Sequence, residues 1–186
     1  MQYELTTPCM AADLAPLKAG DTVLLSGVVY TARDQAHKRM LEALDKGEKL
    51  PFDLEGSAIY YVGPTPERPG EVIGSAGPTT SGRMDAMSPR LLDLGNKIMI
   101  GKGKRDAAVK EAVVRNGAVY LAALGGAGAL MAQSVKTLEV IAWPDLGCEA
   151  VRRLTVEDMP LTVILDAHGG DLYLSGPEAY REAQVK

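Results

Sequence analysis

The chain has 186 residues, a formal net charge of −4, an apolar share of 46% and a charged share of 24%. This length and composition are typical of one globular domain that folds without a disulfide or a structural metal. The mild acidity and the dispersed basic residues argue against a nucleic-acid partner.

The sequence shows no apolar run of about 18 residues and no basic-then-apolar leader, which predicts a protein that is neither membrane-spanning nor secreted. The two cysteines, Cys9 and Cys148, lie far apart and form no C-x-x-C pair. They cannot build a metal site on their own, and a reduced cytoplasmic location is the simplest interpretation.

Short apolar runs predict strands, and caps followed by apolar residues at helical spacing predict helices. In the first half of the chain we expect strands over 2–7, 22–30, 57–62, 71–75 and 97–101, with helices over 31–47 and 88–95 between them. In the second half we expect a helix over 106–117, a strand over 118–122, and a glycine-rich turn over 124–130 that leads into a short helix to 133. Strands over 138–143, 150–155, 161–166 and 171–174 and a helix from 177 complete the prediction. Strand–loop–helix units in the middle and strands at both ends predict a single α/β domain over residues 1–186, with a mixed or layered sheet.

The second predicted strand leads into a helix that carries an arginine near its start. Thr31 and Asp34 fit a capping box and are predicted to open this helix. Arg33 then lies in the first turn, where the positive end of the helix dipole disfavours a cation by about 0.3–1 kcal/mol. A bound anion would offset this cost, and a solvated surface arginine is the alternative.

Residues 77–85 read G-P-T-T-S-G-R-M-D and are predicted to follow a strand. Thr79, Thr80 and Ser81 supply three hydroxyls in a row, more than one helix N-cap needs. Together with Arg83 they indicate a binding site for a small anionic ligand. The alternative is a well-capped turn between a strand and a helix.

Three basic side chains share one kind of position in the predicted fold. Arg33, Arg83 and Lys102 each follow a predicted strand and stand close to a predicted helix start. If the strands are neighbours, these loops meet at one edge of the sheet, the usual ligand site of α/β proteins. Three cations beside helix N-termini suit a small molecule with two carboxylates.

A nucleotide site fits the glycine-rich segments poorly. Gly126 and Gly128 would begin a dinucleotide-binding pattern, but Met131 stands where its third glycine belongs. The run G-K-G-K over residues 101–104 lacks the Ser or Thr that follows the lysine of a phosphate loop. Close backbone approach to a ligand or to a neighbouring chain explains these glycines better.

The two histidines of the chain are candidates for different kinds of site. Asp166, His168 and Asp171 have residue types that can bind a metal, but the two glycines between them favour a hairpin turn. His37 lies one helical turn beyond Arg33 and is predicted to be a supporting or surface residue. No Ser-His-Asp or Cys-His nucleophile set is indicated.

Three motifs resemble those of one family. The stretch over 77–85 is similar to the signature of the β subunit, or C-terminal domain, of class I (iron–sulfur) fumarate hydratase and L(+)-tartrate dehydratase. T-A-R-D-x-A-H at 31–37 and I-G-K-G at 100–103 resemble two further family motifs. The resemblance extends over nearly the whole chain, and it implies a swivelling β/β/α three-layer domain with a mixed sheet.

The resemblance also implies a cofactor and a partner. A 4Fe-4S cluster would be bound by an α subunit, or N-terminal domain, and not by this chain. In the family the open iron acts as a Lewis acid on the substrate hydroxyl and a carboxylate. This chain would be the β subunit of a hydro-lyase that is active only with that partner, as a homodimer or an α2β2 assembly.

The family's pattern assigns roles to individual residues. Three cations would bind the dicarboxylate substrate: Arg33, Arg83 and Lys102. Thr79 would take part in proton transfer, together with an acid from the α subunit. Four further residues are candidates for supporting these groups: Thr80, Ser81, Asp85 and His37.

Several basic residues lie outside the roles that the family's pattern assigns. Lys104 and Arg105 match no assigned role, and Arg152 and Arg153 stand shortly after Glu149, where the family often carries an aromatic residue. Hydration of fumarate to L-malate and dehydration of tartrate both fit, because both substrates present two carboxylates. The non-enzymatic alternative is a dicarboxylate-binding module.

Overall fold

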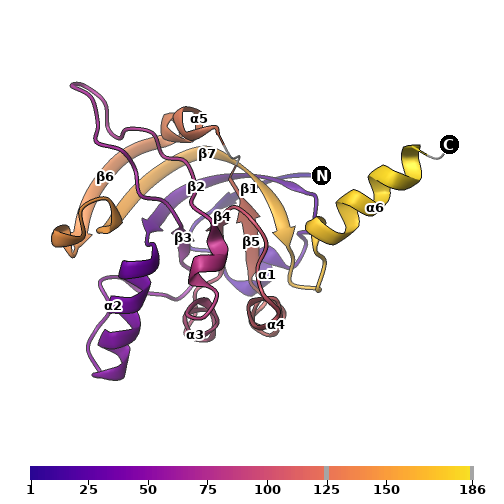
Figure 1. The fold of residues 1–186 in the computed structure, drawn as a ribbon, viewed down its shortest axis with the longest axis horizontal. Coiled ribbons are helices and arrows are strands. Elements are labelled where there is room, and N and C mark those ends of the chain that lie inside the picture. Colours follow the sequence, from indigo (N-terminus) through magenta and orange to yellow (C-terminus); the bar gives the residue numbers. More distant parts are fainter. Residues whose placement is uncertain (124–125, 185–186) are drawn as a thin grey trace.

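The computed structural model describes residues 1–123 and 126–184, and its strands form one mixed sheet (Figure 1). The strands are β1 (Gln2–Thr6), β2 (Thr22–Thr31), β3 (Ala58–Tyr60), β4 (Ile98–Gly101), β5 (Val119–Ala122), β6 (Val135–Ala142) and β7 (Val151–Leu165). Their order in the sheet is β1-β2-β3-β4-β5-β7-β6. The predicted α/β class and mixed sheet are confirmed.

Five of these strands close into a barrel. β2, β3, β4 and β5 pair in parallel, and β7 runs antiparallel to both β5 and β2. The 15 residues of β7 make this possible, because residues 151–156 pair with β6 and residues 162–165 pair with β5 on the same edge. The opposite edge of β7 pairs with β2. β1 extends the sheet at β2, and β6 extends it at β7.

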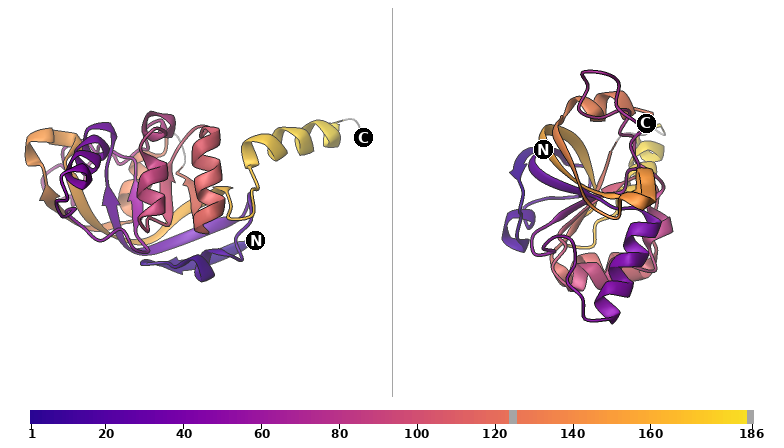
Figure 2. Two further views of the ribbon diagram at one scale, coloured as in Figure 1. Left: turned by 90° about the horizontal axis from the view of Figure 1, so that it is seen from below. Right: turned by 90° about the vertical axis from the view of Figure 1, so that its left-hand side faces the viewer.

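Helices cover the sheet unequally. They are α1 (Ala11–Leu14), α2 (Asp34–Asp45), α3 (Ser88–Asp93), α4 (Ala107–Asn116), α5 (Gly128–Gln133) and α6 (Leu172–Gln184), with two 3-10 segments, η1 (Ser81–Met84) and η2 (Pro144–Glu149). α2, α3 and α4 lie side by side on one face, and α6 extends away from the body (Figure 2). Among the described residues, no helix combines the length and apolar character that a bilayer crossing requires.

The apolar interior consists of two clusters separated by the sheet. Successive residues of β3 alternate between them: Tyr60 lies in the cluster inside the barrel, whereas Ile59 belongs to the cluster under the helices. Both residues are almost completely buried. Because β3 is covered on both faces, its sequence is a continuous apolar run rather than an alternating one.

Local signals predicted α4 well. The side chain of Asp106 caps the helix by accepting the Val109 N–H at 2.9 Å. At the other end Gly117 adopts a left-handed conformation with φ 58°, which glycine reaches without steric cost. These two signals act within a few residues, so the sequence alone could place this helix.

The start of α2 was predicted wrongly. Thr31 does not cap the helix, because it is the last residue of β2 and its hydroxyl lies 3.3 Å from the carbonyl of Ala150 and accepts the Arg152 N–H. The helix begins at Asp34, and Arg33 is its N-cap residue. The Thr31 hydroxyl is thus used in the pairing of β2 with β7.

The predicted strand over residues 71–75 is also wrong. This stretch belongs to an irregular loop that is closed by hydrogen bonds between Thr65 and Ser75. Val72 is 44% exposed, so the short apolar run does not enter the sheet. Residues 77–85 therefore follow a loop and not a strand.

The strands predicted over 150–155 and 161–166 are one continuous strand, β7. Pro160 does not interrupt it. The residue pairs with Leu24 of β2 on one edge, and on the other edge it falls between the parts of β7 that pair with β6 and with β5, where a missing N–H removes no ladder hydrogen bond.

The end of the chain differs from its prediction as well. Asp171 makes a single bridge with Leu165 rather than a strand, and α6 begins at Leu172, with Pro177 inside it. In the predicted turn over 124–130, residues 124 and 125 lie outside the described residues.

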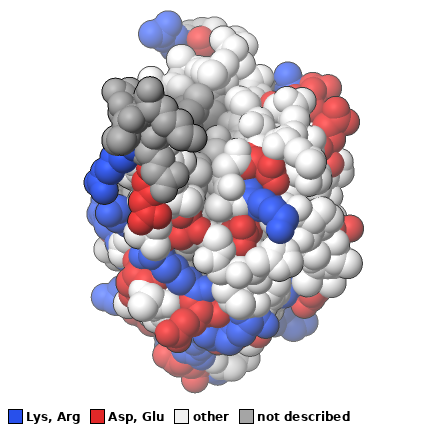
Figure 3. Space-filling view, turned by 90° about the vertical axis from the view of Figure 1, so that its right-hand side faces the viewer, with Lys and Arg blue, Asp and Glu red and all other residues white. Residues whose placement is uncertain are grey.

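Figure 3 shows the side of the molecule on which α6 projects. Basic and acidic side chains are interspersed over that face. This mixture agrees with the dispersed charges of the sequence.

Candidate functional site

Three parallel strands end at one edge of the barrel. β2, β3 and β4 run in the same direction and end at Thr31, Tyr60 and Gly101. The carboxyl ends of parallel strands are the usual ligand site of α/β proteins. The predicted site residues lie in the segments that follow β2 and β4, and in residues 77–85, which run across the ends of β3 and β4.

Residues 77–85 cross this edge. The Thr79 N–H donates to the carbonyl of Tyr61 at 2.8 Å, just beyond the end of β3. The next residue, Thr80, forms a parallel bridge with Lys102, just beyond the end of β4. The structure therefore brings Thr79 and Thr80 close to Lys102, although the preceding segment is not a strand.

The side chain of Arg33 is packed at the N-terminus of α2. It is 18% exposed, and its Nη2 lies 3.6 Å from Oε1 of Glu149. A Cβ at Gly63 would clash with the guanidinium in this orientation, so the arginine packs directly against the backbone of Gly63. Within the described part of the chain, the buried Nε of Arg33 has no hydrogen-bond partner.

Arg83 lies beside the same helix start. Its Nη2 is paired with Oδ2 of Asp34, and the arginine side chain is 49% exposed. The other oxygen of Asp34, Oδ1, is buried and lacks a hydrogen-bond partner among the described residues. Asp34 is thus an internal counterion of Arg83, as Glu149 is of Arg33.

His37 is completely buried behind Arg33. Its Nδ1 lies 3.0 Å from the carbonyl of Arg33, and its ring meets Tyr61 edge-on at 5.3 Å. Burial lowers the pKa of His37 to about 4; the Arg33 carbonyl opposes this shift, Arg105 adds to it and Asp34 opposes it. A neutral ring must donate from Nδ1, because a carbonyl only accepts. His37 is therefore buried rather than on the surface, and it contacts the backbone of Arg33.

Burial of His37 is expected to make the protein less stable as the pH falls from 6.5 to 4. The folded-state pKa of about 4 lies below the ordinary 6.5, so the unfolded chain binds the proton first and stability decreases through this window. The difference corresponds to roughly 3 kcal/mol. Urea unfolding at pH 7 and pH 4.5 should show a smaller loss for His37→Asn than for the native chain. Equal pH dependence of the native chain and His37→Asn would contradict the prediction.

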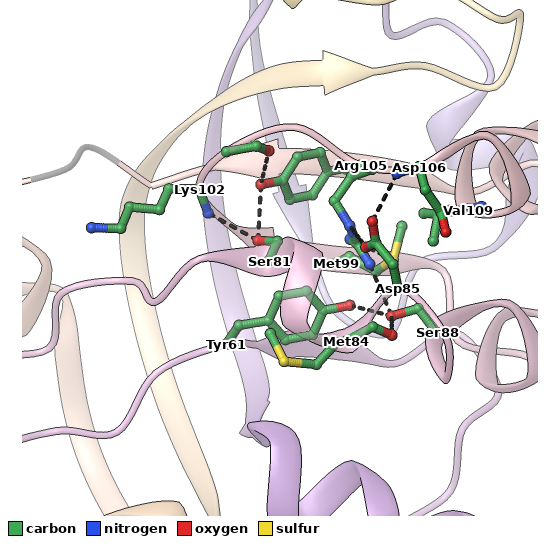
Figure 4. A network of polar contacts seen from close by, with 12 residues as sticks. Tyr61, Ser81, Met84, Asp85, Ser88, Met99, Lys102, Arg105, Asp106 and Val109 are labelled. Atoms are coloured by element: carbon green, nitrogen blue, oxygen red, sulfur yellow. Dashed lines mark hydrogen bonds and ion pairs between the residues drawn. The ribbon is translucent and has the colours of Figure 1, made fainter.

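Lys102 and Ser81 are linked through the backbone. The Lys102 N–H donates to Ser81 Oγ at 3.0 Å, and the Ser81 N–H donates to the Lys102 carbonyl at 2.8 Å. Ser81 Oγ also lies 2.9 Å from the hydroxyl of Tyr120. The Lys102 side chain is exposed and points away from this buried network (Figure 4). Ser81 therefore supports the backbone of Lys102.

A buried ion pair fixes the end of the motif. Arg105 has a fully buried side chain, and its Nε donates to Oδ1 of Asp85 at 2.6 Å (Figure 4). Oδ2 of Asp85 accepts the Asp106 N–H at 2.7 Å. The guanidinium also lies over two rings, at 5.3 Å from Tyr61 and 5.0 Å from Tyr120. Asp85 thereby joins the motif to the start of α4, and Arg105 is a buried structural residue.

The two later arginines also have structural contacts. Arg152 donates to the carbonyls of Gly147, Cys148 and Ala150 at 2.9–3.0 Å, which fastens the η2 segment to β7. Arg153 lies 4.0 Å from Glu139 on the neighbouring strand β6.

Asp166 organises a turn. Its carboxylate accepts the backbone N–H groups of Ala19, His168 and Gly170 at 2.8–2.9 Å. Asp171 is paired with Lys110 at 2.7 Å. Among the described residues, no group of three or more His, Cys, Asp or Glu side chains is placed to hold a metal ion.

Two clefts lie beside the loop over residues 64–75. One has a volume of about 430 Å³ and extends to Cys148, and the other has a volume of about 480 Å³ and extends to α5. Neither cleft is lined by Arg33, Arg83 or Lys102. The three cations thus lie outside both clefts.

Sequence patterns assigned no role to Glu149 or Tyr61, and they marked Asp34 only as a cap. Glu149 reaches α2 across 114 positions of the sequence, where it accepts the Gln35 N–H at 3.0 Å. No local pattern reveals a contact of that length.

Comparison with known proteins agrees with these motifs. Residues 1–176 match the family model described as "Fumarase C-terminus". A protein of Methanocaldococcus jannaschii, provisionally named L(+)-tartrate dehydratase subunit beta, is 43% identical over 167 residues, which cover 87% of this chain and 86% of that protein. The L(+)-tartrate dehydratase subunit beta of Escherichia coli is 32% identical over 187 residues, which cover 98% of this chain and 92% of that protein.

A third relative is much longer than this chain. Fumarate hydratase class I, aerobic, of Escherichia coli is 38% identical over 164 residues, which cover 87% of this chain but 30% of that protein. The chain therefore spans about 30% of the length of this fumarate hydratase and most of the length of the two tartrate dehydratase subunits.

Proposed function

This chain belongs to the fumarase C-terminal family of hydro-lyases, and from this premise we propose that it is the β subunit of an iron–sulfur hydro-lyase. The reaction that we propose is the reversible hydration of fumarate to L-malate. The observation that supports the proposal is that Arg33 and Lys102 follow the ends of β2 and β4, that Thr79 is bonded beside the end of β3, and that Arg83 pairs with Asp34 at the start of α2.

A second candidate is the β subunit of an L(+)-tartrate dehydratase. It is favoured by the coverage of 86% and 92% of two relatives with that name, against 30% of a fumarate hydratase. Fumarate, malate and tartrate all carry two carboxylates, and the same three cations suit each of them.

In the proposed reaction this chain supplies the binding groups. The two arginines can each bind a carboxylate with two parallel hydrogen bonds, and Lys102 adds a compact positive charge. Positioned cations stabilise the negative charge that develops when the proton beside a carboxylate leaves. Asp34 and Glu149 neutralise part of the charge of the two arginines before substrate arrives.

The iron–sulfur cluster would belong to the partner subunit. A cluster takes three or four thiolates, and this chain has two cysteines, of which Cys9 is buried and Cys148 is exposed. Bound by the partner, the cluster would supply a Lewis acid. The exposure of Arg83 and Lys102 is compatible with a second protein that completes the site. We also infer that the domain swivels as a β/β/α unit when it closes over this partner.

Co-expression under anaerobic conditions with a cluster-bearing α subunit tests the function. The complex is expected to turn over malate, fumarate or tartrate, and the substrate with the largest kcat/KM identifies the enzyme. The chain alone should show no turnover. Binding of dicarboxylates without turnover by any such complex would support a non-catalytic binding module instead.

Thr79 is proposed to move the proton at the carbon next to the substrate carboxylate. Its backbone is fixed by the hydrogen bond to Tyr61, and its side chain is partly exposed at the ends of the strands. A threonine hydroxyl is a weak base, so an acidic residue of the α subunit, in its carboxylate form, would take the hydroxyl proton of Thr79 as the proton leaves the substrate carbon.

Thr79→Val is expected to lower kcat of the complex by about 100-fold or more, with a small change in KM, because general acid–base catalysis contributes roughly that factor. Thr79→Ser keeps the hydroxyl and should retain most of the activity. Steady-state kinetics of both variants check this expectation, and equal activity of Thr79→Val and Thr79→Ser would contradict it.

A further inference from the structure

We propose that Glu149 is a positioning residue that holds the guanidinium of Arg33 in the orientation that binds a substrate carboxylate. The inference rests on the proposed role of Arg33. Glu149 ends the η2 segment, and the sequence patterns assign no role to this residue.

The carboxylate of Glu149 contacts two different groups. Its Oε1 lies 3.6 Å from Nη2 of Arg33, and its Oε2 accepts the Gln35 N–H at 3.0 Å. The side chains of Glu149 and Arg33 are each only 18% exposed, so solvent screens this pair less than it screens a surface pair. One carboxylate therefore connects the arginine to the first turn of α2.

Arg33 needs such a partner because of where it lies. It is the N-cap residue of α2, where no side chain of the residue itself caps the helix and where the helix dipole repels a cation. The carboxylate of Glu149 places a negative charge beside the N-terminus of α2 and, at the same time, beside the guanidinium of Arg33. Without it, the arginine would stand beside the positive end of the helix with no counterion from η2.

The contacts of Arg33 leave part of its guanidinium available. One side is restricted by Gly63, where a Cβ would clash with the arginine, and Nη2 is directed toward Glu149. A guanidinium has five N–H donors, so a single acidic neighbour does not saturate it. Glu149 can fix the plane of the group while other N–H donors remain for a ligand.

The η2 segment is fastened at several points, so that Glu149 is held in place. Arg39 of α2 donates to both oxygens of Asp145 at 3.0 and 2.5 Å. Arg152 donates to three carbonyls between residues 147 and 150. These contacts join η2 to α2 and to β7, and they give Glu149 a rigid base from which to orient Arg33.

The test is made on the reconstituted complex with its α subunit. Glu149→Gln keeps the size of the side chain and an acceptor for the Gln35 N–H, but it removes the charge next to Arg33. We expect KM for the dicarboxylate to rise about tenfold, with kcat within about threefold, because the substitution removes the charge that orients the guanidinium and leaves the proposed proton-transfer group in place. The dissociation constant of succinate, measured by calorimetry on the same complex, should rise by a similar factor.

Asp145→Asn is the matched control. It removes a carboxylate from the same η2 segment and weakens the contact with Arg39, but Asp145 does not touch Arg33. Its KM and its succinate affinity should stay close to those of the native complex. Equal increases in KM for the two variants would overturn the inference, because Glu149 would then act only by anchoring the segment.

Arg33→Ala separates this inference from the proposed function. A large rise in KM for Arg33→Ala with none for Glu149→Gln would overturn the role of Glu149 alone. A KM that falls in Glu149→Gln would also overturn it, because the carboxylate would then compete with substrate. No change in Arg33→Ala would overturn the proposed substrate-binding role of Arg33 itself.

Discussion

Arg83→Ala is expected to lower kcat/KM of the assembled enzyme about a thousandfold. Arg83 is the proposed partner of one substrate carboxylate, and removal of one member of a close charge pair costs roughly 2–5 kcal/mol. A loss of about 4 kcal/mol corresponds to a factor of about a thousand. Steady-state kinetics of the reconstituted complex on the identified substrate measure the effect.

A second arginine with similar surroundings provides the control. Arg90 is 44% exposed and paired with Asp45, whereas Arg83 is 49% exposed and paired with Asp34. Arg90 lies on α3 and has no proposed contact with substrate. Arg90→Ala should therefore keep kcat/KM within about twofold, because an exposed ion pair contributes little. Near-native turnover of Arg83→Ala would contradict the proposed function.

Arg105→Met is expected to lower the free energy of unfolding by roughly 3–5 kcal/mol, the usual effect of removing one partner of a buried ion pair. The variant would leave the Asp85 carboxylate without its cation in a site where the arginine side chain is fully buried. It would also remove the charge that lies over the rings of Tyr61 and Tyr120. Urea denaturation of the chain followed by circular dichroism measures the change.

An exposed pair of the same type gives the comparison. Arg115 and Asp93 have side chains that are 48% and 46% exposed. Arg115→Met should change the free energy of unfolding by less than about 1 kcal/mol. Similar losses for Arg105→Met and Arg115→Met would show that burial of the Arg105 pair does not dominate its contribution.

Elements with local signals were predictable from the sequence. Asp106 and Gly117 mark both ends of α4, and the apolar run of β2 marks a strand that is buried. The strand ends that carry Arg33 and Lys102 were also predicted, because each follows a clear apolar run. Both segments leave the same end of the sheet because β2 and β4 run in the same direction, with β3 between them.

Features that depend on distant pairing were not predictable. Closure of the barrel requires β7 to meet both β2 and β5, and nothing in residues 150–166 shows that the two predicted strands are one. The burial of Arg105 depends on Asp85 and on rings from two strands. The Thr31 hydroxyl fitted a capping box locally, but β7 provides its actual partners.

The order in which β2 and β7 occur along the chain has a consequence for folding during synthesis. β2 spans Thr22–Thr31, whereas the strand that pairs with it along that length spans Val151–Leu165. Contacts between such distant segments form slowly, because a long loop must close before they stabilise the structure. While the ribosome makes the intervening residues, one edge of β2 has no partner, and the barrel can close only after β7 has emerged.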